Sequence, residues 1–543
     1  MAANKNVDVA ALVAHYQQTG NAAETARHFG ISRGTVSHHL DAAGLKGKPL
    51  HGGHLGSMVE VRSREVPKKG VRRYMLTCAQ NNTTLNDTVW ENLLALRAYY
   101  NAELLVSRFT YQKSMYAAYV KVNTAQASDF DDQWFDPRID LYTCDHRVEL
   151  APGLVFCGEM NTLPTAARPL TGFETYTGRK SGIFPHVKVA LDSIASVGDD
   201  PVKFNYTTGT VTKQNYLQKA AGLKASHHHC YGALLVEVDA SGSWWVRQLT
   251  ADSRGRIYDV GDRDDGAILV EAGKVTFGHR VEGINWGDIH VEERDPLTYE
   301  TAWARGGMLD VLRPRYQFMH DTLSFRSRNH HELGNPHAMY ERYVTGRDSV
   351  RDELGRVVEF LQRESYREWC KTIIVESNHC QALDRWLREA DYRRDPVNAE
   401  MFLRLQARKY QAIREADDKF LLIEWACREL GLNRPGVRFL REDETFVICR
   451  DSGGGIECSM HGHRGIDGAK PTPLGLSRMG RRANTGHTHK AGIIDGLYTA
   501  GVSGRRRQGY NKGPSSWSDS DIVTYPNGKR AIITKWHGKW RAA

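Results

Sequence analysis

Five short groups of polar residues in the second half of the chain carry side chains of the types that bind divalent metal ions. Carboxylates, imidazoles and amide oxygens supply the oxygen and nitrogen ligands that such ions prefer. The groups stand in the segments INWGDIHVEE, YQFMHDTLSF, KTIIVESNHCQ, IECSMHGHRG and NTGHTHKAG. Their polar members are Asp288, His290, Asp321, Asn378, His379, His461, His487 and His489. Because two carboxylates, an amide and several histidines suffice for a metal site, the sequence indicates metal-dependent chemistry.

The elements around these groups favour their convergence. Several groups follow apolar, strand-like runs, such as Thr372–Val375 before Asn378 and a hairpin turning at Gly453–Gly455 before His461. Loops at the ends of neighbouring strands meet at one edge of a sheet, where α/β proteins place their sites. The alternative is that the histidines are structural, since a single Asp-x-His pair arises by chance in many long chains.

The order of the five groups resembles the signature of the calcineurin-like metallophosphoesterase superfamily. That signature is D-x-H, G-D, G-N-H-[DE], a single H and G-H-x-H, and the resemblance covers residues 281–500. It implies an α/β fold with a β-sandwich flanked by helices. It also implies two divalent cations that activate a water and hold the phosphoryl oxygens.

The same resemblance implies a role for each residue. Asp321 would bridge the two cations, and His379 would protonate the leaving oxygen or stabilise the transition state. The remaining ligands would be Asp288, His290 and His489 for one cation, and Asn378, His461 and His487 for the other. The many histidines favour Mn²⁺, Fe or Zn over Mg²⁺, and we expect Mn²⁺.

The chain departs from this signature at three positions. His320 stands where the family has Gly before the second Asp, and Ser377 stands where it has Gly before Asn378. Cys380 replaces the acid after His379, which removes the carboxylate that supports this histidine in the family. Asp384 or another acid is a candidate substitute.

The N-terminal residues 1–45 form a separate helical module. The sequence NAAETARHFGISRGTVSHHLDAAGL resembles the helix-turn-helix of DNA-binding proteins, with a turn at Gly30 and a cap at Ser32. Its second helix would present Ser32, Arg33, Thr35 and His38 to DNA. A small dimerisation or interaction module is the alternative. Residues 46–70, rich in Gly, Pro and Lys, are predicted to be a linker.

Residues 71–280 are predicted to form a second α/β domain. RRYMLTCAQ, DTVWENLLALRAYYN and AELLVSRFTY read as a β-α-β unit, and the later strand-like runs include hairpins. Ser226–Cys230, SHHHC, is expected to be structural. The stretch LTCAQNNT, with the β-α-β unit and the C-terminal phosphoesterase motifs, is similar to the pre-early DNA-transfer proteins of tailed phages, which implies a role in DNA entry or host DNA degradation. A plain structural loop is the alternative for Gln80–Asn82.

The remaining segments could border the site. The insert at 322–370 begins with His330, His331 and His337, which we expect near the site because Asp321 precedes them. Residues 381–430 are predicted to be helical. Residues 501–543 are predicted to be a basic tail that ends in a hairpin turning at Asn527–Gly528. Arg505, Arg506 and Arg507, with Tyr510 and Trp517 nearby, offer charge and stacking surface to a nucleic acid strand.

The charge distribution could form a phosphate-binding footprint, and solvated termini are the alternative. The 543 residues carry a formal net charge of +9, concentrated at the ends: residues 1–75 hold 11 Lys/Arg against 5 Asp/Glu, and residues 501–543 hold 9 against 2. Nine cysteines without a CxxC pair favour reduced thiols, as in a cytosol. No apolar run long enough to cross a bilayer is present in the sequence, and the first residues lack the apolar core of a signal peptide.

We therefore predict a two-metal phosphodiesterase, most simply a DNA nuclease of the cytoplasm, or of the host bacterial cytoplasm if the protein is phage-encoded. Its partner would be DNA and not a membrane, and the sequence leaves open whether the chain forms a homo-oligomer. A phosphatase of small molecules or phosphoproteins, or a non-catalytic DNA-binding regulator, are the alternatives. The loss of the acid at Cys380 favours the regulator, whereas the complete set of proposed ligands argues against it.

Overall fold

A computed structural model describes residues 7–19, 22–43, 61–111, 134–198, 200–509 and 511–542. The chain divides into two compact units, Met1–Val61 and Arg62–Ala543. Most of the predicted linker, residues 46–60, and Tyr510 lie outside the described residues.

The smaller unit is the predicted helical module. Its helices are α1 (Val9–Thr19), α2 (Ala22–Phe29) and α3 (Arg33–Ala42). Their shared core is formed by Leu12, Ala26, Val36 and Leu40, because these apolar residues fall on the inward faces of the three helices. Gly30 adopts a left-handed φ of 60° at the turn, and the Ser32 hydroxyl accepts a hydrogen bond from the Thr35 N–H at 3.1 Å. The predicted turn and cap are both present.

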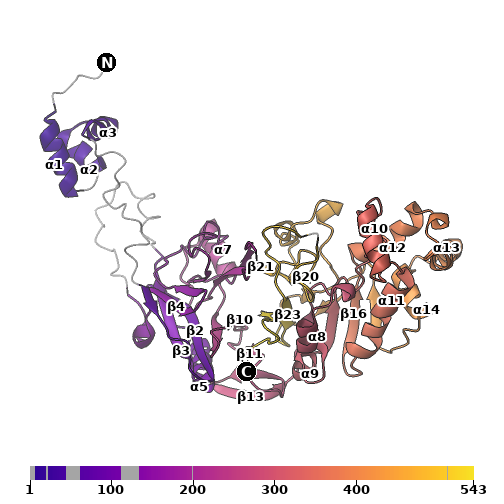
Figure 1. Ribbon diagram of the computed structural model, residues 1–543. Coiled ribbons are helices and arrows are strands. Elements are labelled where there is room, and N and C mark those ends of the chain that lie inside the picture. Colours follow the sequence, from indigo (N-terminus) through magenta and orange to yellow (C-terminus); the bar gives the residue numbers. More distant parts are fainter. Residues whose placement is uncertain are drawn as a thin grey trace. The chain divides into compact units, whose positions relative to one another are not determined.

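The larger unit begins with the predicted β-α-β unit (Figure 1). Strands β2 (Val71–Gln80) and β3 (Glu103–Phe109) are parallel and are joined by helix α5 (Asp87–Tyr100). The hairpin β9 (Gly232–Asp239) and β10 (Trp244–Thr250) completes this sheet in the order β10-β9-β2-β3. A small sheet of β11 (Ile257–Asp259), β12 (Ala267–Glu271) and β13 (Lys274–His279) follows. The predicted strands and hairpins of this segment are therefore confirmed.

The largest sheet has eleven strands, in the order β1-β4-β5-β6-β8-β7-β21-β22-β20-β19-β18. Its first six strands are β1 (Val61–Ser63), β4 (Arg147–Ala151), β5 (Leu154–Cys157), β6 (Ser181–Phe184), β8 (Lys203–Thr207) and β7 (Leu191–Ile194). Its last five are β21 (Gly492–Ile494), β22 (Leu497–Thr499), β20 (Ala483–Thr485), β19 (Ile456–Glu457) and β18 (Val447–Ile448).

This sheet corrects two sequence predictions. Antiparallel pairing of β7 with β21 joins the 71–280 segment to the 281–500 segment, so residue 280 is not a boundary between compact units. Strand β1 lies at residues that were predicted to be linker. Both differences arise from pairing between strands far apart in the sequence, which no local pattern reports.

A six-stranded sheet has the order β17-β16-β15-β14-β23-β24. Its parallel strands are β14 (Gly283–Asn285), β15 (Tyr316–Met319), β16 (Lys371–Val375) and β17 (Val437–Leu440), while β23 (Ser520–Thr524) runs antiparallel to β14. Strand β24 (Arg530–Thr534) forms the predicted hairpin with β23. Gly528 takes the left-handed φ of 73° that the turn requires.

Residues 501–543 are therefore not a tail. Strand β23 is an internal strand of the six-stranded sheet, with β14 on one side and β24 on the other. Burial explains this placement, because every residue of β23 is buried and Ile522 and Val523 contribute to two different core clusters. The net positive charge of the segment had suggested a basic tail.

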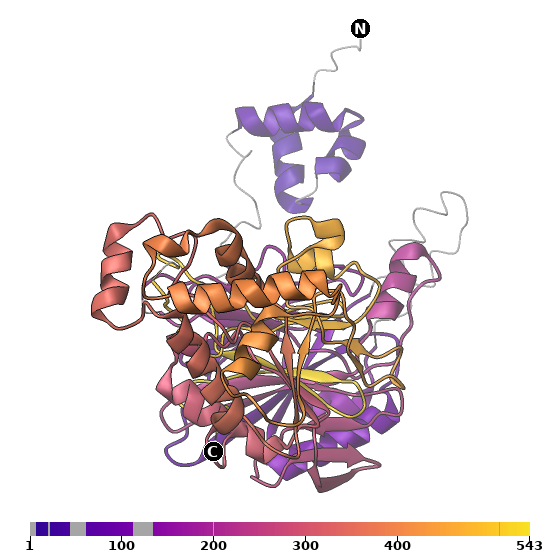
Figure 2. The ribbon, with the colours of Figure 1, turned by 90° about the vertical axis from the view of Figure 1, so that its right-hand side faces the viewer.

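Two cores flank the six-stranded sheet. On one face Phe318, Ile373 and Leu440 pack against Ile448 and Ile456 of the eleven-stranded sheet. On the other face, alternate residues such as Met319 and Ile374 pack against helices. These helices belong to the salmon-to-orange part of the chain in Figure 2 and include α8 (Pro296–Trp303), α9 (Met308–Leu312), α11 (Val350–Glu359), α12 (Asn378–Glu389), α13 (Ala399–Arg414) and α14 (Leu422–Glu429).

The mixed α/β class is confirmed, and so is the helical character of residues 381–430. Three further helices are α7 (Ala220–His228), α10 (Pro336–Val344) and α15 (Pro473–Leu476). Within the residues that the structure describes, no helix combines the length and the apolar character needed to cross a membrane.

Removing residues 501–543 should abolish cooperative thermal unfolding of the larger unit. The truncation deletes β23 and β24, the two strands on one side of β14, and exposes the backbone groups and core residues of β14. Circular dichroism or calorimetry on the purified chain measures this. Removal of residues 1–61 is the matched control and should leave the main transition in place, since that segment is a separate compact unit. A truncated protein that melts at the temperature of the full chain would show that the segment is a tail after all.

Candidate metal centre

The ends of the parallel strands bring the first three groups together. Asp288 and His290 follow β14, Asp321 follows β15, and Asn378 begins the helix after β16. The loops are themselves hydrogen-bonded: the His290 N–H donates to the Asp321 carbonyl at 2.8 Å. His461 follows β19, and His487 and His489 follow β20 in the facing sheet. All five groups predicted from the sequence therefore lie at one site.

The C-terminal strands hold the loop of Asp288 in place. The Gly287 N–H donates to the Asp521 carboxylate at 2.9 Å, and the Ser503 N–H donates to the Asp288 carbonyl at the same distance. Asp521 in turn pairs with the buried Lys535 of the last hairpin. The segment that was predicted to be a tail thus positions a candidate metal ligand.

Four of the proposed ligands have unusual backbone conformations. Asp321, His290, His487 and His489 adopt φ values of 47°, 45°, 71° and 55°. Non-glycine residues adopt this left-handed region rarely, and such conformations concentrate at functional sites where the surrounding structure enforces them.

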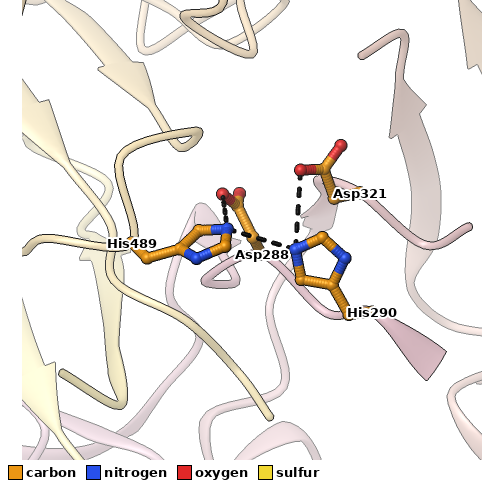
Figure 3. Close-up of side chains that lie close together, drawn as sticks. All are labelled: Asp288, His290, Asp321 and His489. Atoms are coloured by element: carbon orange, nitrogen blue, oxygen red, sulfur yellow. Dashed lines mark hydrogen bonds and ion pairs between the residues drawn. The ribbon is translucent and has the colours of Figure 1, made fainter. Parts of the chain in front are cut away.

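One group of side chains converges on a common point. The ligand atoms of Asp288, His290, Asp321 and His489 all lie within 4.8 Å of one another (Figure 3). The His489 Nε2 lies 3.0 Å from Asp288 Oδ2 and 3.1 Å from the His290 Nε2. The His290 Nε2 is 3.7 Å from Asp321 Oδ2. Two imidazole nitrogens aimed at each other between two carboxylates are the arrangement expected of metal ligands.

Only part of the second set of predicted ligands lies close together. The His461 Nε2 lies 3.0 Å from Asn378 Oδ1 and 3.4 Å from Asp321 Oδ2. The His487 ring is farther out, with its centroid 5.1 Å from that of His461. Asp321 therefore stands between the first set of ligands and the second, which is the place of a shared carboxylate.

Burial and hydrogen bonding show that these residues suit a cation. Asp288 is fully buried and Asp321 is 2% exposed. Asp288 Oδ1 and Asp321 Oδ1 receive no hydrogen bond from the part of the chain that the structure describes. An uncompensated buried carboxylate is costly, and a bound cation removes that cost. The cluster could therefore hold a metal ion.

The pKa values of these side chains favour ligation. Burial alone would raise the pKa of Asp288, but the neighbouring His461 and His489 outweigh it and lower that pKa to about 2. Burial also holds the pKa of His290 well below its ordinary value and lowers that of His487 to about 4. The carboxylate is thus ionised and these two imidazoles are neutral near pH 7, the forms that bind metals.

A backbone carbonyl, and not the acid that the sequence suggested, holds the His379 ring. Its Nδ1 lies 2.7 Å from the Ser324 carbonyl oxygen, which can only accept, so Nδ1 carries the proton. Asp384 is not its partner, because that carboxylate pairs with Lys409 at 2.9 Å. The predicted substitution by Asp384 is wrong, and a backbone carbonyl orients the ring.

The two other departures from the family signature also have structural roles. Ser377 caps helix α12, since its hydroxyl accepts from the Cys380 N–H at 3.4 Å, and Cys380 is buried beneath the site. The ligand atoms of His320, Asp288 and His461 lie within 4.8 Å of one another. His320 was not among the ligands predicted from the sequence, where it is only a departure from the signature. A histidine adjoining a bridging carboxylate was the signal that could have marked it as a ligand.

A cavity of about 400 Å³ opens onto the metal centre. Its lining includes His290, Asp321, Asn378, His379, His487 and His489. The insert contributes His330 and His331, as expected, whereas His337 does not line the cavity and instead begins helix α10. Trp517 forms part of the wall, with its ring 3.9 Å from that of His489 between centroids.

The predicted nucleic-acid contacts lie in both units. In the smaller unit Ser32 and Thr35 hydrogen-bond to each other at 2.8 Å, His38 is exposed, and the Arg33 side chain lies outside the described residues. In the larger unit Arg505, Arg506 and Arg507 are all exposed, next to the cavity-lining Gln508. The guanidinium of Arg506 lies over the Trp536 ring at 5.2 Å.

Two other sequence motifs make hydrogen bonds within the fold. Asn81 accepts from the Tyr111 N–H at 2.7 Å, and Asn215 donates to the Asn81 and Asn82 carbonyls. In the SHHHC stretch His229 hydrogen-bonds Tyr216 at 2.7 Å. These contacts explain the residue types without a ligand.

Fold and site together define a mixed α/β protein with a buried Asp/His cluster that could hold a metal ion. The chain is 40% identical over 484 residues to Protein A1 of Escherichia phage T5, and the match covers 87% of this chain and 83% of the phage protein. The chain therefore belongs to the family of that phage protein, which supports a phage origin. No protein-family model and no solved structure matches the chain.

Replacing Gly486 by alanine should weaken metal binding about 10-fold or more. An added Cβ would collide with Asp288 Oδ1 and would lie 3.2 Å from His320 Cγ, so the carboxylate must move. Calorimetric titration of the apo-protein with Mn²⁺ measures the change. Gly355→Ala is the matched control, because its added Cβ meets no atom within 4 Å. Equal affinities in the two variants would separate Gly486 from the metal centre.

Proposed function

We propose that the protein is a phosphodiesterase that uses two divalent metal ions to cleave DNA. The observation that supports this most strongly is the convergence of Asp288, His290, Asp321 and His489. The order of the motifs along the chain, which resembles the metallophosphoesterase signature, supports the same chemistry.

Each proposed ligand set would hold one cation. Asp288, His290, Asp321 and His489 would bind the first, and Asp321, Asn378, His461 and His487 would bind the second. Mn²⁺ suits this mixture of carboxylate, amide and imidazole donors, and Fe, Zn and Mg²⁺ are the other candidates. When bound, two such ions supply a water nucleophile at neutral pH and polarise the phosphoryl group.

The protein's own residues would then orient the substrate and protonate its leaving oxygen. The cavity above the centre would place the scissile phosphate against His290, Asp321 and Asn378. With Nδ1–H fixed on the Ser324 carbonyl, the His379 Nε2 lies 3.8 Å from Asp321 Oδ2, and both residues line the cavity. A proton on this Nε2 is suitably placed for transfer to the leaving oxygen.

DNA as the substrate is supported by the basic and helical features outside the centre. The helix-turn-helix would bind duplex DNA through α3, and Arg505–Arg507 would contact backbone phosphates beside the cavity. A protein with this substrate would act in the bacterial cytoplasm. The size of the cavity, about 400 Å³, also suits a small phosphomonoester, which makes a phosphatase the second candidate.

Asp321→Asn should abolish metal-dependent cleavage. The substitution keeps the shape of the side chain but removes the charge shared by both ligand sets. The assay uses supercoiled plasmid, linear duplex and single-stranded DNA, each with EDTA, Mn²⁺, Mg²⁺ or Zn²⁺. Asp384→Asn is the matched control, because that carboxylate pairs with Lys409 away from the site. Absence of metal-dependent cleavage by the unmodified chain would refute the nuclease, and turnover of a nitrophenyl monoester alone would favour the phosphatase.

His379→Gln should lower the turnover number about 100-fold while metal binding is retained. The glutamine keeps a donor for the Ser324 carbonyl but cannot deliver a proton as a general acid. Single-turnover cleavage and Mn²⁺ titration measure the two effects separately. Loss of bound metal together with activity would make His379 a ligand, and unchanged turnover would remove it from the reaction.

A further inference from the structure

His320 lies behind the metal centre, on the face of β15 that packs against the other sheet. It follows Met319 directly, and Phe318, two residues earlier, is in the core between the two sheets. The side chain is fully buried and does not line the cavity. Neither of its ring nitrogens has a hydrogen-bond partner among the residues described.

Two other donor atoms face the same space. The ligand atoms of Asp288, His320 and His461 lie within 4.8 Å of one another. The Asp288 Oδ1 is 3.8 Å from the His461 Nδ1, and both atoms also lack a hydrogen bond within the described part of the chain. Three polar groups that are too far apart to bond one another, and that are shut off from solvent, leave room for a bridging ion.

Asp288 and His461 each have one atom toward this space and one toward the cavity side. Asp288 Oδ2 faces the His489 Nε2 at 3.0 Å, and the His461 Nε2 faces Asn378 Oδ1 at 3.0 Å. The atoms left over are Asp288 Oδ1 and His461 Nδ1. The group with His320 thus shares Asp288 and His461 with the ligand sets of the proposed catalytic cations, but it uses their other donor atoms.

We propose that Asp288 Oδ1, His320 and the His461 Nδ1 form an inner cation position that selects zinc. Zn²⁺ favours four-coordinate sites with imidazole and carboxylate ligands, and these side chains would supply three of the four ligands. Zn–N distances of about 2.0–2.1 Å place tetrahedral ligand atoms about 3.4 Å apart, so the 3.8 Å separation needs only a small contraction. Mn²⁺ prefers more oxygen ligands and would favour the cavity side.

A zinc ion in the inner position would affect the proposed Mn²⁺-dependent reaction. This step rests on the proposed function. A neutral imidazole has a single lone pair, so His461 can serve the inner zinc through Nδ1 or the second catalytic cation through Nε2, but not both. Zinc in the inner position therefore withdraws a ligand from the catalytic pair. Zinc would inhibit the Mn²⁺-dependent reaction without entering the cavity.

The direct test is zinc binding by the full chain in excess Mn²⁺. After gel filtration, elemental analysis should find one zinc per wild-type chain, and His320→Gln should bind that zinc at least 10-fold more weakly. His463→Gln is the matched control, because that neighbouring histidine belongs to neither group of candidate ligands. Equal zinc affinity of wild type and His320→Gln would overturn the proposal.

Two further readouts keep the test independent of folding and of nuclease activity. Anomalous scattering at the zinc edge from wild-type crystals should place a peak between Asp288, His320 and His461, and a peak-free space or a water there would contradict it. In cleavage assays the zinc concentration for half-inhibition should rise at least 10-fold in His320→Gln, whereas equal inhibition would count against the proposal. A chain that binds the inner zinc but cleaves no DNA would refute the proposed function alone.

Discussion

The structure depends on two buried carboxylates, Asp288 and Asp321, whose ion-pair partners in the described part of the chain are histidines. Burial of ionised groups is unfavourable unless opposite charge or hydrogen bonds compensate. Here the surroundings offer mainly histidines, and burial keeps the pKa of several of them low. The chain thus assembles a strongly electronegative centre that a divalent cation would complete.

The rest of the larger unit serves to hold these side chains against one another. Parallel strands β14, β15 and β16 deliver one ligand group each at the same sheet edge, and the facing sheet delivers the histidines after β19 and β20. The C-terminal hairpin reinforces the arrangement from the other side, because Asp521 binds the Gly287 N–H and Lys535 neutralises Asp521. A segment distant in sequence therefore helps to position a candidate ligand.

Local patterns were enough to predict much of this molecule. The β-α-β unit, the hairpins and the three N-terminal helices follow from apolar periodicity and turn residues within short windows. The convergence of Asp288, His290, Asp321 and His489 was predictable because each group stands in a loop after a strand. Pairing between distant strands could not be predicted from local patterns. The β7–β21 junction and the internal place of β23 were therefore missed. Nor does any spacing reveal that the Ser324 carbonyl supports His379, or that His320 turns toward Asp288 and His461.

We propose that two cations share Asp321, and electron paramagnetic resonance of the Mn²⁺-loaded chain is a direct test. Two metal ions about 3.5–4 Å apart interact magnetically. If two cations share Asp321, two equivalents of Mn²⁺ per chain should give the many-line spectrum of an exchange-coupled manganese pair. A six-line spectrum of isolated Mn²⁺, unchanged between one and two equivalents, would contradict it.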